Sequence, residues 1–175
     1  MKINHNKVYI AFGSNLRSNS YKSTEIFFHA IEFRLRLIGL KVKRKSHLWK
    51  SAAIPYSCGP IFYNCVVECT LLLSCKPSPE KLLKDIENLE KKLGKKFKGE
   101  NKQRSIDIDI LDFQGKVLHS QIYLPHPRMH LRKFVLYPLS ELDKHWCHPV
   151  LKKSCTFLIS KIKDSQFLKK RKMFS

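Results

Sequence analysis

The stretch RSIDIDIL, residues 104–111, decides the fold because it alternates strictly between isoleucines and polar or charged residues. Successive side chains of a β-strand point to opposite faces, so the three isoleucines are predicted to face a core. Asp107 and Asp109 then share the other face, where adjacent like charges are unfavourable unless something neutralises them. A Mg²⁺ ion that also holds phosphates is one neutraliser, because paired carboxylates are its usual protein ligands. A half-exposed strand with an acidic, solvated face explains the same pattern equally well.

The bulk composition predicts one soluble domain. The chain has 175 residues, of which 43% are hydrophobic, so we expect a single domain over residues 1–160 and a basic, solvated tail over residues 161–175. No apolar run reaches the roughly 18 residues that span a bilayer, and no signal-peptide pattern opens the sequence, so a cytoplasmic protein is expected. The six cysteines lack CxxC or zinc-ligand spacing, which favours reduced, structurally incidental thiols.

The charge balance is strongly basic. The 34 Lys and Arg residues against 14 Asp and Glu residues give a formal net charge of +20. Such an excess predicts attraction to a polyanion, whether nucleic acid, a membrane surface or a phosphorylated small molecule, without selecting among them. Lysines on solvated faces account for part of the excess, because they are spread along the whole chain.

Apolar periodicity predicts an alternation of strands and helices before the acidic strand. We expect strands over residues 7–12, 40–50 and 61–73 and helices over residues 18–39 and 79–94. Gly13 to Asn15 form a turn-forming tripeptide, and Ser78 with Pro79 is a good helix start. The connection over residues 51–60 is longer than usual, and long ordered loops tend to be functional. Residues 134–139 suit either a last buried strand or the start of a short helix.

Three further features bear on binding. Phe62 and Asn64 share one face of their strand, where they could stack on a flat heterocycle and bond to its edge, although an ordinary core Phe is the simpler interpretation of this pair alone. Glu90 falls inside the apolar stripe of its helix, with Glu87 just outside it, so Glu90 needs a lysine partner or a ligand. The basic loop of residues 95–103 suits closure over phosphates.

Five motifs occur in the order found in the 6-hydroxymethyl-7,8-dihydropterin pyrophosphokinase family. They are Gly13-Ser14-Asn15, Phe62-Tyr63-Asn64, Glu90 with Leu93-Gly94, Arg104 to Leu111, and Leu124-Pro125-His126-Pro127-Arg128. The chain resembles this family over residues 8 to 150 or so. The resemblance implies an α+β, ferredoxin-like βαββαβ sandwich with an antiparallel sheet, helices packed on one face and C-terminal additions. It also implies transfer of pyrophosphate from ATP to the pterin hydroxymethyl group in folate biosynthesis.

The resemblance further implies which residues form the site. Asp107 and Asp109 would hold two Mg²⁺ ions, and Arg104 and Lys95 would join them in catalysis. ATP would be bound by Glu87, Glu90, Lys95, Arg104, Ile110, His126 and Arg132. The pterin would be bound by Ser51, Ala52, Ala53, Ile54, Phe62, Asn64 and Phe134, the two phenylalanines sandwiching its ring. No nucleic acid or membrane partner is implied, and a monomer is expected.

The sequence departs from the family in the basic loop. Lys95-Lys96-Phe97 replaces an arginine-rich pair, and lysine cannot form a bidentate fork to phosphate, so we expect an active enzyme whose loop holds the transition state less firmly. An RNA-recognition module on the same fold is the alternative that the basic charge raises. It lacks support here, because the sequence has no Gly-Phe-x-Phe-type strand motif and two aspartates would repel phosphates without a metal.

Overall fold

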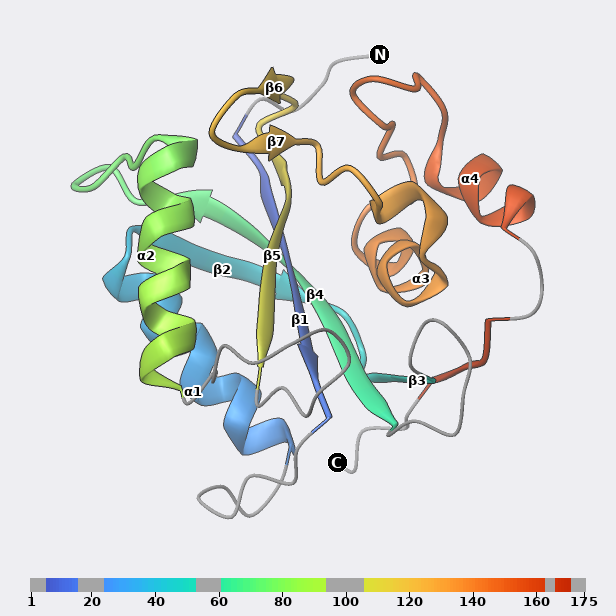
Figure 1. The fold of residues 1–175 in the computed structure, drawn as a ribbon, viewed down its shortest axis with the longest axis horizontal. Coiled ribbons are helices and arrows are strands. Elements are labelled where there is room, and N and C mark those ends of the chain that lie inside the picture. The colour runs from blue at the N-terminus through green and yellow to red at the C-terminus, as the bar shows by residue number, and fades with distance from the viewer. Residues whose placement is uncertain (1–5, 16–23, 53–60, 94–105, 163–165, 171–175) are drawn as a thin grey trace.

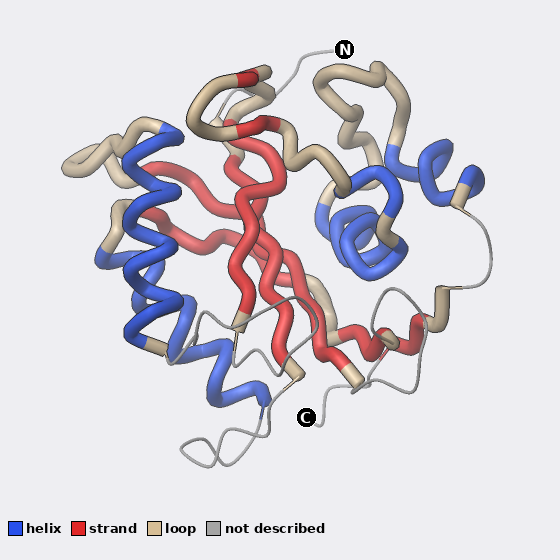
Figure 2. Tube along the Cα trace, in the orientation of Figure 1, coloured by secondary structure: helices blue, strands red, loops and turns tan. Residues whose placement is uncertain are grey.

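A computed structural model describes residues 6–15, 24–52, 61–93, 106–162 and 166–170. Its strands and helices, in chain order, are β1 (Val8–Ser14), α1 (Thr24–Leu37), β2 (Leu40–Lys45), β3 (Trp49–Ser51), β4 (Phe62–Leu71), α2 (Pro79–Lys92), β5 (Asp107–Phe113), β6 (Leu118–His119), β7 (Tyr123–Leu124), the 3₁₀ helix η1 (Met129–Leu131), α3 (Lys133–Leu142), α4 (Cys155–Lys161) and β8 (Leu168–Lys170). A central sheet stands between two groups of helices (Figures 1 and 2).

The central sheet is antiparallel and has the strand order β5-β1-β4-β3-β8, with β2 also paired to β4. Together β2 and β3 occupy one strand position, so the chain up to β5 follows the βαββαβ plan. The expected α+β, ferredoxin-like fold class is therefore confirmed. The short β6 and β7 form a separate hairpin beside the end of β5.

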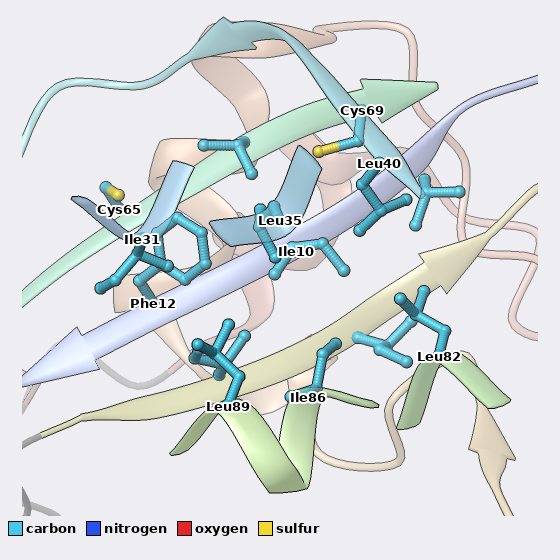
Figure 3. Close-up of a cluster of buried hydrophobic side chains, with 14 of the residues drawn as sticks. Ile10, Phe12, Ile31, Leu35, Leu40, Cys65, Cys69, Leu82, Ile86 and Leu89 are labelled. Atoms are coloured by element: carbon cyan, nitrogen blue, oxygen red, sulfur yellow. The ribbon is translucent and has the colours of Figure 1, made fainter. Parts of the chain in front are cut away.

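The first face of the sheet is covered by α1 and α2 (Figure 1). Ser78 caps α2 by accepting a hydrogen bond from the Lys81 N–H group at 3.2 Å, and Pro79 is the first helical residue, as the sequence predicts. Side chains from both helices and from β1, β2, β4 and β5 meet in one apolar cluster (Figure 3). Its labelled members in that view are Ile10, Phe12, Ile31, Leu35, Leu40, Cys65, Cys69, Leu82, Ile86 and Leu89.

The second face of the sheet carries the C-terminal additions α3 and α4. A second apolar cluster lies under them, formed by Tyr9, Val66, Leu111, Met129, Val135, Leu136, Leu139, Leu142, Trp146, Cys155 and Leu158. Residues 134–139 are thus part of a helix, and the strand alternative is wrong. Helices therefore cover both faces, the expected pair on one and the additions on the other.

Two predicted boundaries are wrong for identifiable reasons. The strand expected over residues 40–50 is interrupted at Ser46, whose hydroxyl oxygen accepts the Val66 N–H bond at 3.0 Å and donates to the His47 carbonyl at 2.9 Å. Gly13 and Ser14 belong to β1 and not to a turn, since they pair with Asn64 and Tyr63 of β4.

A register shift in β5 lets this strand serve both clusters. Ile10 of β1 faces Ile110, whereas Tyr9 faces Asp112, so Leu111 is an extra residue in the ladder. Leu111 and Asp112 both face the second cluster as a result. The Asp112 carboxylate accepts a hydrogen bond from the Trp146 ring N–H at 2.8 Å, and burial raises the pKa of this carboxyl.

The C-terminal residues correct our expectation of a solvated tail. Leu168–Lys170 form strand β8, which pairs with β3 at the edge of the sheet and is the red segment beside β3 in Figure 1. Lys170 also forms an ion pair with Glu141 of α3 at 2.8 Å. Among the described cysteines, those at positions 65, 69, 75, 147 and 155 are free thiols. No helix among the described residues combines the length and the apolar character needed to cross a membrane.

Candidate functional site

Asp107 and Asp109 lie side by side on the second face of the sheet, beyond the part that α3 covers. Their side chains are half-exposed, while the flanking Ile108 is buried on the first face. In the β1–β5 pair, Gly13 faces Asp107 and Ala11 faces Asp109. Directly opposed residues of antiparallel strands share a face, so the smallest two side chains of the neighbouring strand stand next to the carboxylates. The neighbouring strand therefore adds little side-chain bulk beside the carboxylates.

Two basic side chains approach Asp109 from outside the sheet. The His126 ring Nε2 and the Arg132 Nη1 each lie 3.8 Å from the Asp109 carboxylate oxygen Oδ2. His126 is tied to the strand by its backbone N–H group, which donates to the Leu111 carbonyl at 2.9 Å. These 3.8 Å separations are longer than hydrogen bonds, so neither basic group is directly hydrogen-bonded to Asp109 Oδ2.

The protonation of His126 is set by its surroundings. Burial lowers its pKa below the ordinary value, Arg132 lowers it further, and Asp109 acts in the opposite direction. Its Nδ1 accepts the Arg128 N–H bond at 3.2 Å, which leaves the ring proton on Nε2, facing Asp109. His126 is therefore a neutral hydrogen-bond donor at this site near pH 7.

Asn64 of β4 lies in the same cross-strand row as Asp107. Gly13 stands between them, paired to Asn64 on one side and to Asp107 on the other. A side chain at position 13 would crowd this row, because a Cβ atom there would lie 3.2 Å from the Asn64 Oδ1. The Asn64 amide donates to the Ser51 hydroxyl at 3.0 Å and to the Trp49 carbonyl at 3.4 Å, which fixes its orientation.

One aromatic ring adjoins this row, and a second lies beside Arg132. Phe62 precedes Asn64 by two residues on β4, so the two side chains share the second face, and Phe62 pairs with Ser51. Phe134, at the start of α3, packs at the margin of the second cluster and is half-buried. The Arg132 guanidinium carbon lies 5.5 Å from the centre of the Phe134 ring, within cation–π range.

The structure separates three of the predicted ATP-binding residues from the carboxylate pair. Ile110 is buried in the first cluster, so its side chain faces away from Asp107 and Asp109. Glu87 is exposed on α2, and Glu90 is buried on the same helix, which covers the first face. A role for these three residues in binding ATP remains a prediction. It would require the nucleotide to reach around the edge of β5.

Glu90 has a partner that the sequence did not indicate. Its Oε1 accepts a hydrogen bond from the Ile108 backbone N–H group at 2.7 Å. Because β5 is the outermost strand at this side of the sheet, its outward N–H groups have no neighbouring strand to bond. The buried carboxylate therefore satisfies an edge group of the strand that carries the aspartates.

Several predicted site residues cannot be placed. Lys95, Arg104, Ala53 and Ile54 lie outside the described residues. Ala52 is half-buried at the end of β3, next to the buried Ser51.

The carboxylates of Asp107 and Asp109 suit a hard cation that takes its other ligands from water and from the substrate. Among the described residues there is no cluster of three or more His, Cys, Asp or Glu side chains able to hold a metal ion, so this part of the chain offers the two carboxylates of Asp107 and Asp109. Mg²⁺ is bound in this way, by one or two carboxylates together with water and substrate phosphates. The paired aspartates therefore fit Mg²⁺.

Sequence reasoning missed two residues of the site, Ala11 and Gly13. The signal was present, because small residues at positions i and i+2 of an otherwise bulky strand, VYIAFGS, leave one face bare. A turn was predicted there because Gly13, Ser14 and Asn15 are all turn formers.

A family model described as 7,8-dihydro-6-hydroxymethylpterin-pyrophosphokinase (HPPK) matches residues 9–144. Among curated proteins, the chain is 34% identical to the folic acid synthesis protein fol1 of Pneumocystis carinii over 163 residues, covering 93% of this chain and 21% of that protein. It is 29% identical to the 2-amino-4-hydroxy-6-hydroxymethyldihydropteridine pyrophosphokinase of Aquifex aeolicus, covering 83% of this chain and 86% of that protein. The chain thus spans about a fifth of the Pneumocystis protein and most of the Aquifex one.

Among solved structures, the chain is similar to Plasmodium falciparum HPPK-DHPS wild type with SDX-DHP. The TM-score is 0.63 at 15% sequence identity, and the match covers 89% of this chain and 44% of that chain. At this level of identity the likeness supports the fold alone.

Proposed function

The chain belongs to the 7,8-dihydro-6-hydroxymethylpterin-pyrophosphokinase family, and from this premise we propose that it transfers a pyrophosphate group from ATP to 6-hydroxymethyl-7,8-dihydropterin. The pterin hydroxyl oxygen attacks the β-phosphorus of ATP and gives up its proton to solvent, the bond between the α,β-bridging oxygen and that phosphorus breaks, and AMP leaves. The products are AMP and the pterin diphosphate, an intermediate of folate biosynthesis.

One observation carries the proposal: Asp107 and Asn64 lie in one row across three strands with only Gly13 between them, and Asp109 lies in the next row on the same face, opposite Ala11. A phosphate-binding side and a heterocycle-binding side are thereby brought next to each other on a rigid sheet. Phosphoryl transfer of this kind asks the protein for in-line positioning and charge stabilisation more than for covalent chemistry.

Asp107 and Asp109 would hold Mg²⁺, two ions being expected from the family. When bound, the metal neutralises the charge of the phosphates and of the attacking oxygen. The two half-exposed carboxylates offer oxygens on one face of a strand whose ladder with β1 keeps them at fixed spacing. Ala11 and Gly13 keep side-chain bulk away from the reacting groups.

His126 and Arg132 would bind the ATP phosphates. Arg132 presents a fork of N–H donors suited to phosphate oxygens, and neutral His126 presents its Nε2 proton beside Asp109. Both would exchange the long contact to Asp109 for a phosphate oxygen. Lys95 and Arg104 are proposed to add positive charge over the same phosphates, with Lys95 acting as a point charge where an arginine is common in the family.

The pterin would lie against the Asn64 side of the row. Asn64 and the backbone around Ser51 and Ala52 would bond to the polar edge of the ring, while Phe62 and Phe134 would stack on its faces. Asn64 is well suited to this because its amide is already oriented by the Ser51 hydroxyl and the Trp49 carbonyl. A monomeric, cytoplasmic enzyme that takes no nucleic acid completes the proposal, and nothing in the comparisons supports the RNA-binding alternative.

The direct test is AMP release by the purified protein. With 6-hydroxymethyl-7,8-dihydropterin, ATP and Mg²⁺ present, AMP and the pterin diphosphate should form in equal amounts, and EDTA in excess should stop the reaction. Omission of the pterin is the matched control, since AMP formed without it would come from hydrolysis. Failure to form AMP under the complete conditions would overturn the proposal. Salt-dependent binding of single-stranded RNA that survives EDTA would favour the alternative.

A further inference from the structure

Arg132 stands in a one-residue joint between two helices. Its backbone is extended, with φ −119° and ψ 110°, and it ends η1 and caps α3 at the same time. Its N–H group donates to the Met129 carbonyl at 3.2 Å, and its carbonyl accepts from Leu136 at 3.0 Å. The direction in which the guanidinium leaves the joint therefore depends on how the two short helices are held relative to each other.

The residues on either side of Arg132 expose polar groups that the helices do not bond internally. Lys133 is the first residue of α3, and the first N–H groups of an α-helix have no intrahelical acceptor. Leu131 is the last residue of η1, and the last carbonyl groups of a helix likewise have no intrahelical donor. A partner that bonds both groups at once would fix the angle of the joint.

Gln166 is such a partner. Its Oε1 accepts from the Lys133 N–H group at 2.8 Å, and its Nε2 donates to the Leu131 carbonyl at 2.8 Å. One side-chain amide thus bridges the two peptide groups that flank Arg132. The two bonds use both ends of a planar group, which restrains rotation as well as distance.

Gln166 is itself anchored from both sides of the site. Two residues later the chain enters β8, where Leu168 pairs with Ser51, the residue whose hydroxyl orients Asn64. The segment ends with Lys170 in an ion pair with Glu141 of α3. Residues 166–170 therefore join β3, on the Asn64 side of the row, to the Arg132 joint near Asp109.

We propose that Gln166 is a positioning residue for Arg132: by bridging Leu131 and Lys133 it aims the Arg132 guanidinium at the phosphate side of the site, so that the C-terminal segment is a working part of ATP binding. The proposal rests on the proposed function for the identity of the ligand. A purely structural staple would lower stability and leave nucleotide affinity of the folded protein unchanged, which separates the two roles.

The test compares Gln166→Ala and Gln166→Glu with Lys169→Ala. Alanine removes both bonds, whereas glutamate keeps an acceptor for Lys133 and loses the donor to Leu131. Lys169 is an exposed residue of β8 and serves as the control for changes in the same segment. Binding of the Mg²⁺ complex of α,β-methylene-ATP is measured by calorimetry. This analogue is not turned over, because a methylene group replaces the bridging oxygen whose bond would break. Amide hydrogen exchange at Lys133 is followed alongside, with Ile108, bonded by Glu90, as the internal reference.

Gln166→Ala should weaken analogue binding about 3- to 10-fold, the size expected for losing one or two hydrogen bonds that orient a ligand group, and speed Lys133 exchange by a similar factor. Gln166→Glu should keep slow Lys133 exchange and weaken binding less. Lys169→Ala should change neither. In an Arg132→Ala background the Gln166→Ala change should have no further effect on binding, because its action passes through Arg132.

Three outcomes would overturn the proposal. They are unchanged analogue affinity in Gln166→Ala despite faster Lys133 exchange, unchanged Lys133 exchange, and full additivity with Arg132→Ala. Failure of the proposed function is distinguishable, since a protein that forms no AMP from ATP and the pterin can still bind the nucleotide analogue through a correctly aimed Arg132. If the wild-type protein does not bind the analogue, Gln166 has no ligand to position and the proposal falls with that result.

Discussion

The two faces of the sheet are built by the same strands and differ in how far they are covered. On the first face, α1 and α2 enclose an apolar cluster that includes Ile108 and Ile110 of β5. On the second face, α3 packs on β3 and β4, and Asp107 and Asp109 of β5 are half-exposed. One strand therefore contributes to a closed core and to an open site, and the alternation of its side chains keeps the two apart.

The difference shows how the fold tolerates a charged site. Burial of the isoleucines holds β5 in register, and the register fixes the spacing of the aspartates. Glu90, the buried carboxylate under β5, bonds a backbone N–H group at the strand edge and so strengthens the same register from the core side. The groups that would repel each other without a ligand stand on the second face, outside both apolar clusters.

The largest expected effect comes from removing a carboxylate on the second face. Asp109→Asn should reduce AMP formation by about a thousandfold or more, because metal-assisted charge stabilisation is worth several kcal/mol in phosphoryl transfer. Its urea unfolding midpoint should stay close to that of the wild type, since the side chain is half-exposed and contributes no apolar burial. Near-normal turnover in this variant would remove Asp109 from the proposed metal site.

The converse change belongs to the first face. Ile31 of α1 is fully buried, and Ile31→Ala should lower the free energy of unfolding by about 2–5 kcal/mol through lost burial and a residual cavity. Turnover per folded molecule should be retained. Leu37→Ala on the same helix is the matched control, because Leu37 is 70% exposed and should cost less than about 0.5 kcal/mol. Equal losses in the two variants, measured by urea titration, would contradict the placement of the core.

Sequence patterns sufficed for the elements of the first face. Strict alternation in β5, the capped start of α2 and the apolar stripe of its helix each depend on local periodicity, which a single sequence displays. The same parity put Phe62 and Asn64 on one face of β4 and the isoleucines on the opposite face from the aspartates. Both placements are confirmed by the sheet registers and the buried clusters.

The features that local patterns did not predict depend on contacts between distant segments. Gly13 was assigned to a turn, although its place beside Asp107 and Asn64 explains its size. Glu90 bonds a backbone group 18 residues away, and no periodicity specifies that. The C-terminal residues 168–170 contain two lysines and suggest a solvated end, yet they pair as a strand with β3, because the edge of the sheet offered unpaired backbone groups.

A smaller effect should distinguish the faces by their response to acid. Glu68, Asp112 and His148 are buried ionisable groups of the second face, whereas the first cluster is made of apolar side chains with the carboxylate of Glu90 beside it. Burial lowers the pKa of His148 to about 4, and the neighbouring His130 adds to the shift. The His148 Nδ1 accepts N–H bonds from Val150 and Leu151, both at 3.2 Å, which protonation of that atom would break.

The direction of the pH effect on stability follows from proton linkage. The unfolded chain binds a proton at His148 near pH 6.5, and the folded protein does so only near pH 4, so the unfolded state holds more protons between these values. The contribution of neutral His148 is fully present above pH 6.5 and is lost progressively as the pH falls toward 4, to a limit of about 3 kcal/mol. His148→Gln keeps a side-chain acceptor and does not titrate, so its unfolding free energy should fall less steeply over this interval. His145→Gln, an exposed change in the same loop, should follow the wild type. If the unfolding free energies of wild type and His148→Gln fell in parallel with pH, His148 would not be the source of the acid sensitivity. That result would contradict the assignment of this sensitivity to the second face.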